Sequence, residues 1–408
     1  MILYSFLGAG NLHDTVYEWQ GTQVRTEFSC VACAKILNPE KIVIFETENG
    51  QERHEKLKPQ LADIPHEFVM IADGKNTTEL WQIFSTIVDA IPENAKIAFD
   101  VTNGFRFYPL LGLLAASFTE TVKGTELKYM FYGNYEANRE ESPKPMIDLT
   151  PMLDLMKWTT YADRFIQTGD SSDLAGMLEK MRNNYPDNDE KRRNLADMSQ
   201  DLKDISASFQ MLRPETVRRK GRKLQEDILK IESDITGNPA EQPLFMLLEK
   251  IREQYVQYSD DYSKDHDLQI LRYQRDLIMR YHSLGQYMQA VSLAREWMQT
   301  WVMAWLGTPF EYLFDWSYRE KFSKSLNAFS KGETPDEFTE EEIEKYLPIN
   351  SWTLNNILAN VSSCRNDLDH AGQDQRSKSA KELIKRIDQV ILQIKNLKLP
   401  DDKGEKTC

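Results

Sequence analysis

Cysteine is scarce in this sequence, which excludes one common way of stabilising a fold. Four cysteines in 408 residues are too few for the disulfide framework of a small secreted protein. Cys30 and Cys33 form one CxxC pair, but the sequence has no second pair to complete a four-thiolate zinc site. Because free cysteine behaves as a small apolar residue, we predict that this pair is buried and not redox-active.

Long apolar runs are also missing. No stretch approaches the roughly 20 apolar residues that a membrane-spanning helix needs. Residues 1–7 carry no basic segment and lead directly into Gly8, which is typical of a first strand and not of a signal peptide. The sequence therefore predicts a cytoplasmic protein without a membrane partner.

Positive charge is in deficit overall. The net charge of -14 argues against a protein that coats nucleic acid through a general basic surface. No helix with basic flanks resembles a DNA-recognition helix, so a DNA partner is not expected. One basic cluster could follow RNA phosphates, although the acidic residues after it favour a charged helix face; it comprises Arg213, Arg218, Arg219, Lys220, Arg222 and Lys223.

The first 150 residues alternate strand-like and helix-like stretches, whereas the remainder has helical periodicity. An amphipathic helix is predicted at 79–91, and the almost wholly apolar stretch 109–118 is predicted to be well buried. Strands alternating with helices indicate an α/β Rossmann-like domain, with a mainly parallel sheet covered on both faces, followed by an all-α region. The predicted strands are 2–7, 41–45, 68–71, 96–99 and 127–132.

Polar and glycine-containing loops follow three of these strands. Ligands bind outside the carboxyl ends of such strands. In the loop after the fourth strand, Thr102 and Asn103 offer hydrogen-bonding groups, and Arg106 can reach a phosphate near a helix N-terminus. An ordinary Asn-Gly turn with a solvated arginine is an equally open reading of this loop. The candidate ligand-binding residues are Gly8, Gly10, Asn11, Thr15, Thr47, Thr102, Asn103, Gly104 and Arg106.

A nicotinamide dinucleotide is a weaker candidate for this domain. Gly8 and Gly10 supply two glycines of the dinucleotide fingerprint, but His13 stands where the third is required.

A short motif near the C-terminus carries the residue types that cleave RNA without a metal. His370 can move protons near neutral pH. Arg365 presents a permanently charged fork that matches phosphate. Asn366 and His370 stand at i and i+4, so on a helix the amide can orient the ring. These three residues are the candidate catalytic set, with no metal or cofactor.

The spacing of this motif also bears on assembly. Arg365 and His370 would lie roughly 140° apart around an ideal helix, so they converge only if the helix breaks or a second copy contributes its motif. We therefore expect a homodimer with a composite site, placed between helices predicted at 354–361 and 380–397. An Arg and a His at this spacing also occur by chance in helical proteins.

Taken together, these motifs resemble the CRISPR-associated Rossmann-fold (CARF) sensors joined to a C-terminal HEPN ribonuclease domain, among the Csx-type accessory proteins of type III CRISPR systems. Residues 100–106 with Pro109 are similar to the Asp-x-Thr-His-Gly-x-Arg signature of that family, and residues 6–10 with Thr15 and Tyr17 are similar to its first loop. Arg365, Asn366 and His370 match the HEPN pattern.

The resemblance implies a homodimer or higher even oligomer that binds a cyclic oligoadenylate through its CARF domain. Binding would activate the HEPN site to cut single-stranded RNA, leaving a 2′,3′-cyclic phosphate. The cyclic tetra-adenylate is favoured over the hexa-adenylate as activator. The implied domains are 1–150 (CARF), 151–285 (helical linker or insertion) and 286–408 (HEPN).

One residue departs from the family pattern. Asn103 stands where the family usually has histidine, which bears on ring size and on any cleavage of the ligand by the sensor. Two alternatives stay open: a nucleotide sensor without nuclease activity, and a sensor that degrades its own ring.

Overall fold

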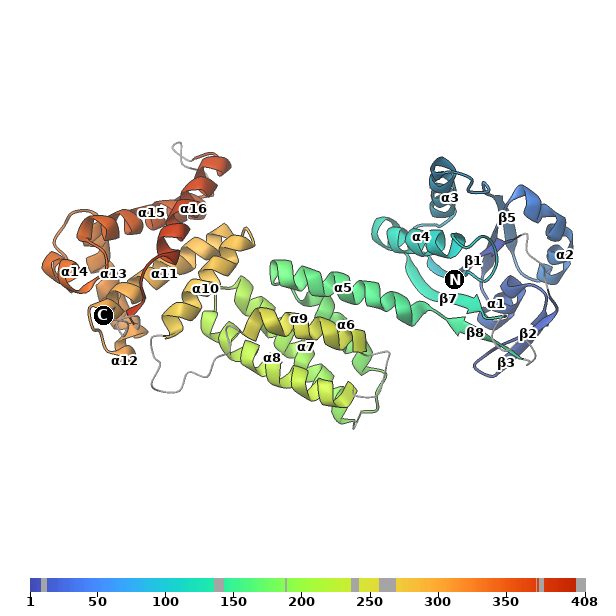
Figure 1. The fold of residues 1–408 in the computed structure, drawn as a ribbon, viewed down its shortest axis with the longest axis horizontal. Coiled ribbons are helices and arrows are strands. Elements are labelled where there is room, and N and C mark those ends of the chain that lie inside the picture. Colours follow the sequence, from blue (N-terminus) through green and yellow to red (C-terminus); the bar gives the residue numbers. More distant parts are fainter. Residues whose placement is uncertain are drawn as a thin grey trace, which may run out of the picture. The chain divides into compact units, whose positions relative to one another are not determined.

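The computed structural model describes residues 1–8, 13–135, 143–187, 189–235, 242–256, 269–371, 373 and 378–400. The chain forms two compact units, Met1–Lys157 and Trp158–Cys408 (Figure 1). The first is an α/β unit and the second is helical, as the sequence predicts. Helix α5, Thr150–Thr168, runs across the boundary between them.

The first unit is built on one eight-stranded sheet of order β3-β2-β8-β7-β6-β1-β4-β5. The five strands at the β7 to β5 end of this order are parallel and correspond to the five predicted strands. The strands are β1 Ile2–Leu7, β2 Thr15–Trp19, β3 Thr22–Thr26, β4 Lys41–Glu46, β5 His66–Met70, β6 Lys96–Asp100, β7 Glu126–Gly133 and β8 Lys144–Asp148.

Alternate residues of β1 explain why both faces of the sheet are covered. Leu3 and Leu7 belong to one buried cluster, with side chains of α1 and α2. Tyr4 and Phe6 belong to a second, with side chains of α3 and α4. This is the period of two expected of a strand buried on both sides. The helices are α1 Ser29–Leu37, α2 His54–Leu57, α3 Thr77–Asp89 and α4 Tyr108–Lys123, and short 3₁₀ helices span Glu48–Arg53 and Lys58–Leu61.

Strands β2, β3 and β8 were not predicted. They form the polar end of the sheet, where β2 pairs antiparallel with β3 and β8 pairs antiparallel with β7. Their alternating residues are only partly buried, and Pro145 lies within β8, so their pattern is weak.

The second unit consists of packed helices around one buried cluster that extends from Ala162 to Leu399. Trp297 and Trp301 of α11 are fully buried, as its apolar stripe predicts, and their indole nitrogens donate to the carbonyls of Leu271 and Lys398 at 2.7 and 2.8 Å. The helices are α6 Ser172–Arg182, α7 Glu190–Gln210, α8 Pro214–Ile235, α9 Gln242–Val256, α10 Gln269–Ser283, α11 Tyr287–Trp305, α12 Phe310–Leu313, α13 Trp316–Ser330, α14 Glu340–Tyr346, α15 Ser351–Asp369 and α16 Ala380–Lys395.

Helix α15 is longer than predicted. The sequence suggested a helix at 354–361, with the Arg365 motif between helices. Instead α15 continues to Asp369, because Leu354, Ile357, Val361 and Cys364 form one buried stripe along it. The motif therefore occupies the last turn of α15, and His370 is the residue that follows it.

The CxxC pair is buried in α1, as predicted. Cys30 and Cys33 are free thiols at 3% and 0% exposure, and burial raises the pKa of both well above the usual range. Across the part of the chain that the structure describes, no helix is long and apolar enough to cross a membrane.

Candidate functional site

The loops after β1 and β6 meet at the carboxyl edge of the sheet. The two strands are neighbours in the sheet, with β4 and β5 beyond β1 on one side and β7 beyond β6 on the other. A Cβ added to Gly8 would lie 2.5 Å from the backbone nitrogen of Gly104, so only glycine permits this approach. Gly104 itself has φ +105°. The predicted residues Gly8 and Gly104 thus meet where such sheets bind ligands.

Asn103 is held by a buried network that the sequence did not reveal. Asp100, at the end of β6, accepts hydrogen bonds from the hydroxyls of Ser5 and Ser29 at 2.8 and 2.7 Å and from the Thr102 amide at 3.1 Å. Ser29 in turn accepts a hydrogen bond from Asn103 Nδ2 at 2.8 Å. Burial raises the pKa of Asp100, and these hydrogen bonds act against that rise. The network fixes one end of the Asn103 amide.

Replacing Ser29 by alanine is expected to destabilise the first unit by about 1–3 kcal/mol, because Asp100 and Asn103 lose a buried partner. The pKa of Asp100 is already raised in the folded protein. The contribution of the Asp100 carboxyl to stability therefore falls as the pH rises through its folded pKa. Loss of Ser29 raises that pKa further, so we expect the destabilisation to be larger at neutral than at acidic pH.

Urea unfolding at both pH values tests this expectation. Ser172→Ala is the matched control, because it removes a hydroxyl–carboxylate hydrogen bond to Asp170 (2.7 Å) at an exposed position. A Ser29→Ala loss that does not depend on pH would contradict the assigned role of Asp100.

Thr102 connects this loop to the end of β7. Its hydroxyl accepts a hydrogen bond from the Gly133 amide at 2.7 Å. Because β2 runs parallel to β8 and β8 runs antiparallel to β7, the start of β2 lies at the same edge as the end of β7. The predicted residue Thr15, which is buried, begins β2 there. His13 stacks on Tyr135 at this edge with ring centroids 5.0 Å apart, a pair that the sequence analysis did not select.

The remaining predicted binding residues differ in their surroundings. Thr47 is buried just after β4. Arg53, which was not predicted, donates to the Gly8 carbonyl oxygen. Arg106 is exposed before α4 and has no hydrogen bond or ion pair within the described residues. Gly10 and Asn11 lie outside the described residues.

The Arg365 motif is accessible but not assembled within one chain. Arg365 Nη2 pairs with Asp369 Oδ2 at 2.8 Å, and both side chains are about one-third exposed (37% and 31%). Asn366 and His370 are exposed. They are linked through the backbone, where the His370 amide donates to the Asn366 carbonyl at 3.0 Å. The structure thus presents the three residues at one helix end without a hydrogen bond joining their side chains.

Polar side chains continue along α15 toward α16. Arg386 of α16 donates to Asn360 Oδ1 at 3.0 Å and to Ser363 Oγ at 3.3 Å. Arg386 thereby fixes α16 against α15 two residues before Arg365. Burial raises the pKa of Cys364, and the Arg386 charge acts in the opposite direction.

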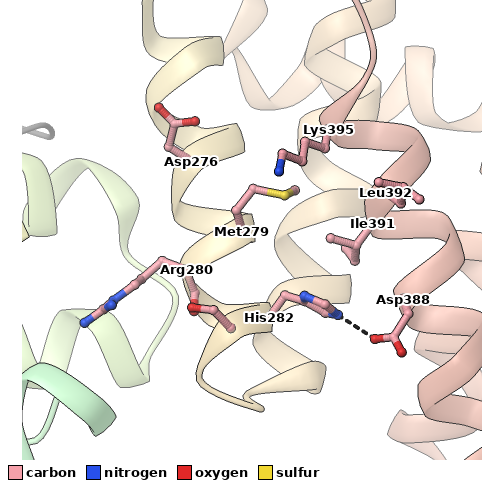
Figure 2. A pocket seen from close by; sticks show the side chains of 9 residues that line it. Asp276, Met279, Arg280, His282, Asp388, Ile391, Leu392 and Lys395 are labelled. Atoms are coloured by element: carbon pink, nitrogen blue, oxygen red, sulfur yellow. Dashed lines mark hydrogen bonds and ion pairs between the residues drawn. The ribbon is translucent and has the colours of Figure 1, made fainter.

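A separate groove of about 700 Å³ lies between α10 and α16 (Figure 2). The pair His282 Nε2–Asp388 Oδ1, 2.7 Å apart, spans one end. Burial raises the pKa of Asp276. None of the three motif residues lines the groove, whose lining is Asp276, Met279, Arg280, His282, Ser283, Asp388, Ile391, Leu392 and Lys395.

Comparison with known proteins gives a match in the helical unit. Residues 154–260 match the family model described as CRISPR-associated protein MJ1674, second domain. This links the chain to CRISPR-associated proteins. CRISPR-associated protein MJ1674 of Methanocaldococcus jannaschii is 26% identical over 113 residues, which cover 27% of this chain and 18% of the relative.

The matched segment has a definite place in the fold. It begins within α5 and includes α6 to α9. The loops at the sheet edge and the Arg365 motif both lie outside it. The link to CRISPR-associated proteins therefore rests on residues 154–260, which lie between the two candidate sites in the sequence.

Proposed function

We propose that this CRISPR-associated protein is an endoribonuclease that a cyclic oligoadenylate activates, and that it cuts single-stranded RNA in type III CRISPR antiviral defence. The observation that carries the proposal is that the two motifs occupy two separate compact units, each with its polar residues at the end of an ordered element. One unit offers glycine and polar side chains at a sheet edge, and the other offers a partly exposed Arg365 and an exposed His370.

The sensor role is supported by the geometry at the sheet edge. Gly8 and Gly104 let the two loops pack against each other at this edge, and the exposed Arg106 beside them carries a charge that suits a phosphate. Asn103 adds an amide with a fixed orientation. Such a combination suits an anionic nucleotide, for which the cyclic tetra-adenylate is our first candidate and the hexa-adenylate our second.

The nuclease role follows from the chemistry of RNA cleavage. The 2′-oxygen attacks its own phosphorus, the bond to the 5′-oxygen breaks, and a 2′,3′-cyclic phosphate remains. We assign His370 to proton transfer, Arg365 to stabilising the charge on the phosphoryl group, and Asn366 to orienting the site. This scheme needs no metal or other cofactor.

A homodimer is part of the proposal, because one chain holds Arg365 against its own Asp369, and no side chain of the described residues hydrogen-bonds to His370. A second copy would supply the missing partner groups. The first unit also has a surface suited to self-association: α4, which begins just after Arg106, carries an exposed apolar residue every fourth position, namely Leu110, Leu114, Phe118 and Val122.

The ion pair between Arg365 and Asp369 leads to a specific expectation. An exposed pair of this kind is worth up to about 1 kcal/mol. Asp369→Asn frees Arg365 for phosphate, so kcat/KM for RNA should rise by up to about fivefold. Asp367→Asn is the matched control, because among the described residues its carboxylate accepts one hydrogen bond, from the Lys378 amide at 3.3 Å. A large fall in rate for Asp369→Asn would instead place Asp369 among the catalytic groups.

Incubating the full-length protein with a fluorescent single-stranded RNA and a chelator, with no ring, cyclic tetra-adenylate or cyclic hexa-adenylate, tests the proposal. We expect cleavage with only one ring and a product that ends in a 2′,3′-cyclic phosphate. If the protein binds a ring but never cuts RNA, it is a sensor that recruits a partner. If it shortens the ring, and Asn103 or Arg106 variants abolish this while His370→Ala does not, it is a ring-degrading sensor.

A further inference from the structure

We infer that His13 and Tyr135 form a stacking surface for an adenine base of the bound ring. The inference rests on the proposed function, since it adds a base-recognition element to the same sheet edge.

The two rings have the geometry of a stacking platform. Their planes are 13° apart with centroids 5.0 Å apart. His13 is exposed and Tyr135 is partly exposed, so the pair does not serve the buried core. Lys144, which is buried, places its ammonium 5.8 Å from the centre of the Tyr135 ring. Stacked aromatic rings with exposed surface suit a nucleobase.

The position of the pair ties it to the loop site. Tyr135 follows the end of β7 by two residues, and His13 precedes β2 by two residues. The end of β7 contacts the loop after β6 through a hydrogen bond, which the Gly133 amide donates to Thr102 Oγ1 at 2.7 Å. A Cβ at Gly133 would lie 2.7 Å from the Tyr17 ring. The stacking pair is therefore held next to Thr102 and Asn103.

Asn103 gives this surface a preference among the bases. One N–H of its amide is used by Ser29, and within the described residues the amide makes no other hydrogen bond. Its carbonyl oxygen and second N–H remain as an acceptor next to a donor. Adenine presents the complementary pair, an amino group beside a ring nitrogen, which is the arrangement that asparagine reads in nucleic acids.

Ring binding by full-length variants tests the inference, with cyclic tetra-adenylate and hexa-adenylate as probes in calorimetric titrations. His13→Ala and Tyr135→Leu should each weaken binding about tenfold or more, whereas Tyr135→Phe, which keeps the ring, should bind like wild type. His66→Ala is the matched control, because His66 also contacts an aromatic ring, Phe68 at 5.7 Å, but lies at the amino end of β5.

The binding results distinguish a failure of the stacking role from a failure of the proposed sensor function. If wild type binds neither ring, the sensor function fails and the stacking role fails with it. If wild type binds a ring and both His13→Ala and Tyr135→Leu bind equally well, only the stacking role is overturned. Weaker binding by Tyr135→Phe to the same extent as by Tyr135→Leu would also overturn it, since a structural hydroxyl would then be responsible.

Discussion

Protein carrying His370→Ala is expected to bind the activating ring with unchanged affinity and to cut RNA about 10²- to 10⁴-fold more slowly than wild type. The reason is that we assign proton transfer to His370 and propose that the ring binds to the other unit. Single-turnover cleavage of a fluorescent RNA with saturating ring, together with calorimetric ring binding, measures both quantities.

His282→Ala is the control for this prediction. His282 also lies in the helical unit and pairs with Asp388 across the α10–α16 groove, so its loss removes a histidine and a polar contact without touching the motif. We expect nearly normal cleavage. Equal losses from His282→Ala and His370→Ala would point to the fold of the unit, and normal cleavage by His370→Ala would refute the nuclease site.

A second large effect is expected in the helices that match the CRISPR-associated family. Asp201 of α7 is 1% exposed and pairs with Lys220 and Lys223 of α8 at 2.7 and 2.8 Å. Asp201→Asn should lower the free energy of unfolding of these helices by about 1–3 kcal/mol, because the buried side chain loses its charge-assisted hydrogen bonds to Lys220 and Lys223. Lys220 keeps its pair with Asp204 at 2.5 Å. Hydrogen exchange of α7 and α8 peptides measures this locally.

Asp227 of α8 is the matched comparison. It is also buried, at 2% exposure, but its pKa is shifted in the opposite direction to that of Asp201. Burial and a hydrogen bond with Asp201 raise the pKa of Asp227. Burial opposes ionisation of Asp201 too, but hydrogen bonds from Lys220 and Lys223 outweigh it and lower the pKa of Asp201. Asparagine mimics a protonated carboxyl, so Asp227→Asn should cost about 1 kcal/mol or less at neutral pH.

The loss of unfolding free energy caused by the two substitutions should therefore change with pH in opposite directions. The stabilisation from Asp201 is present above its unfolded pKa and is lost as the pH falls through its folded pKa, so Asp201→Asn costs most at neutral pH. The contribution of Asp227 is lost as the pH rises through its folded pKa, so Asp227→Asn costs least there. If the cost of both substitutions changed with pH in the same direction, the assignment of a lowered pKa to Asp201 and a raised pKa to Asp227 would be wrong.

The sequence predicts the parts of the fold that repeat a simple pattern. The five parallel strands have apolar runs bounded by turns, and α11 and α16 have clear apolar stripes. Strands β2, β3 and β8 were not predicted, because half-buried polar residues and Pro145 weaken the alternation of apolar and polar residues in them. The end of α15 at Asp369 was not predicted, because the buried stripe ends at Cys364 and the polar residues after it give no apolar pattern.

The candidate sites divide in a similar way. The motifs select Gly8, Gly104 and Arg106 because glycine and arginine have recognisable roles in loops. The network through Ser29 and Asp100 joins residues 71 positions apart, and His13 meets Tyr135 only through the order of the strands, so no local pattern reveals either. The Arg365–Asp369 pair, by contrast, has the i,i+4 spacing of a helical ion pair and is readable from the sequence.

The measurement that tests the central claim most directly is the rate of RNA cleavage against the concentration of cyclic tetra-adenylate, for wild type and Arg106→Ala. The account predicts negligible cleavage without ring. It also predicts a half-activating concentration about tenfold or more higher for Arg106→Ala, through loss of a charge-assisted contact, with the same maximal rate. Full cleavage by wild type without any ring, or a lower maximal rate with unchanged half-activation in Arg106→Ala, would contradict a sensor unit that controls a separate nuclease unit.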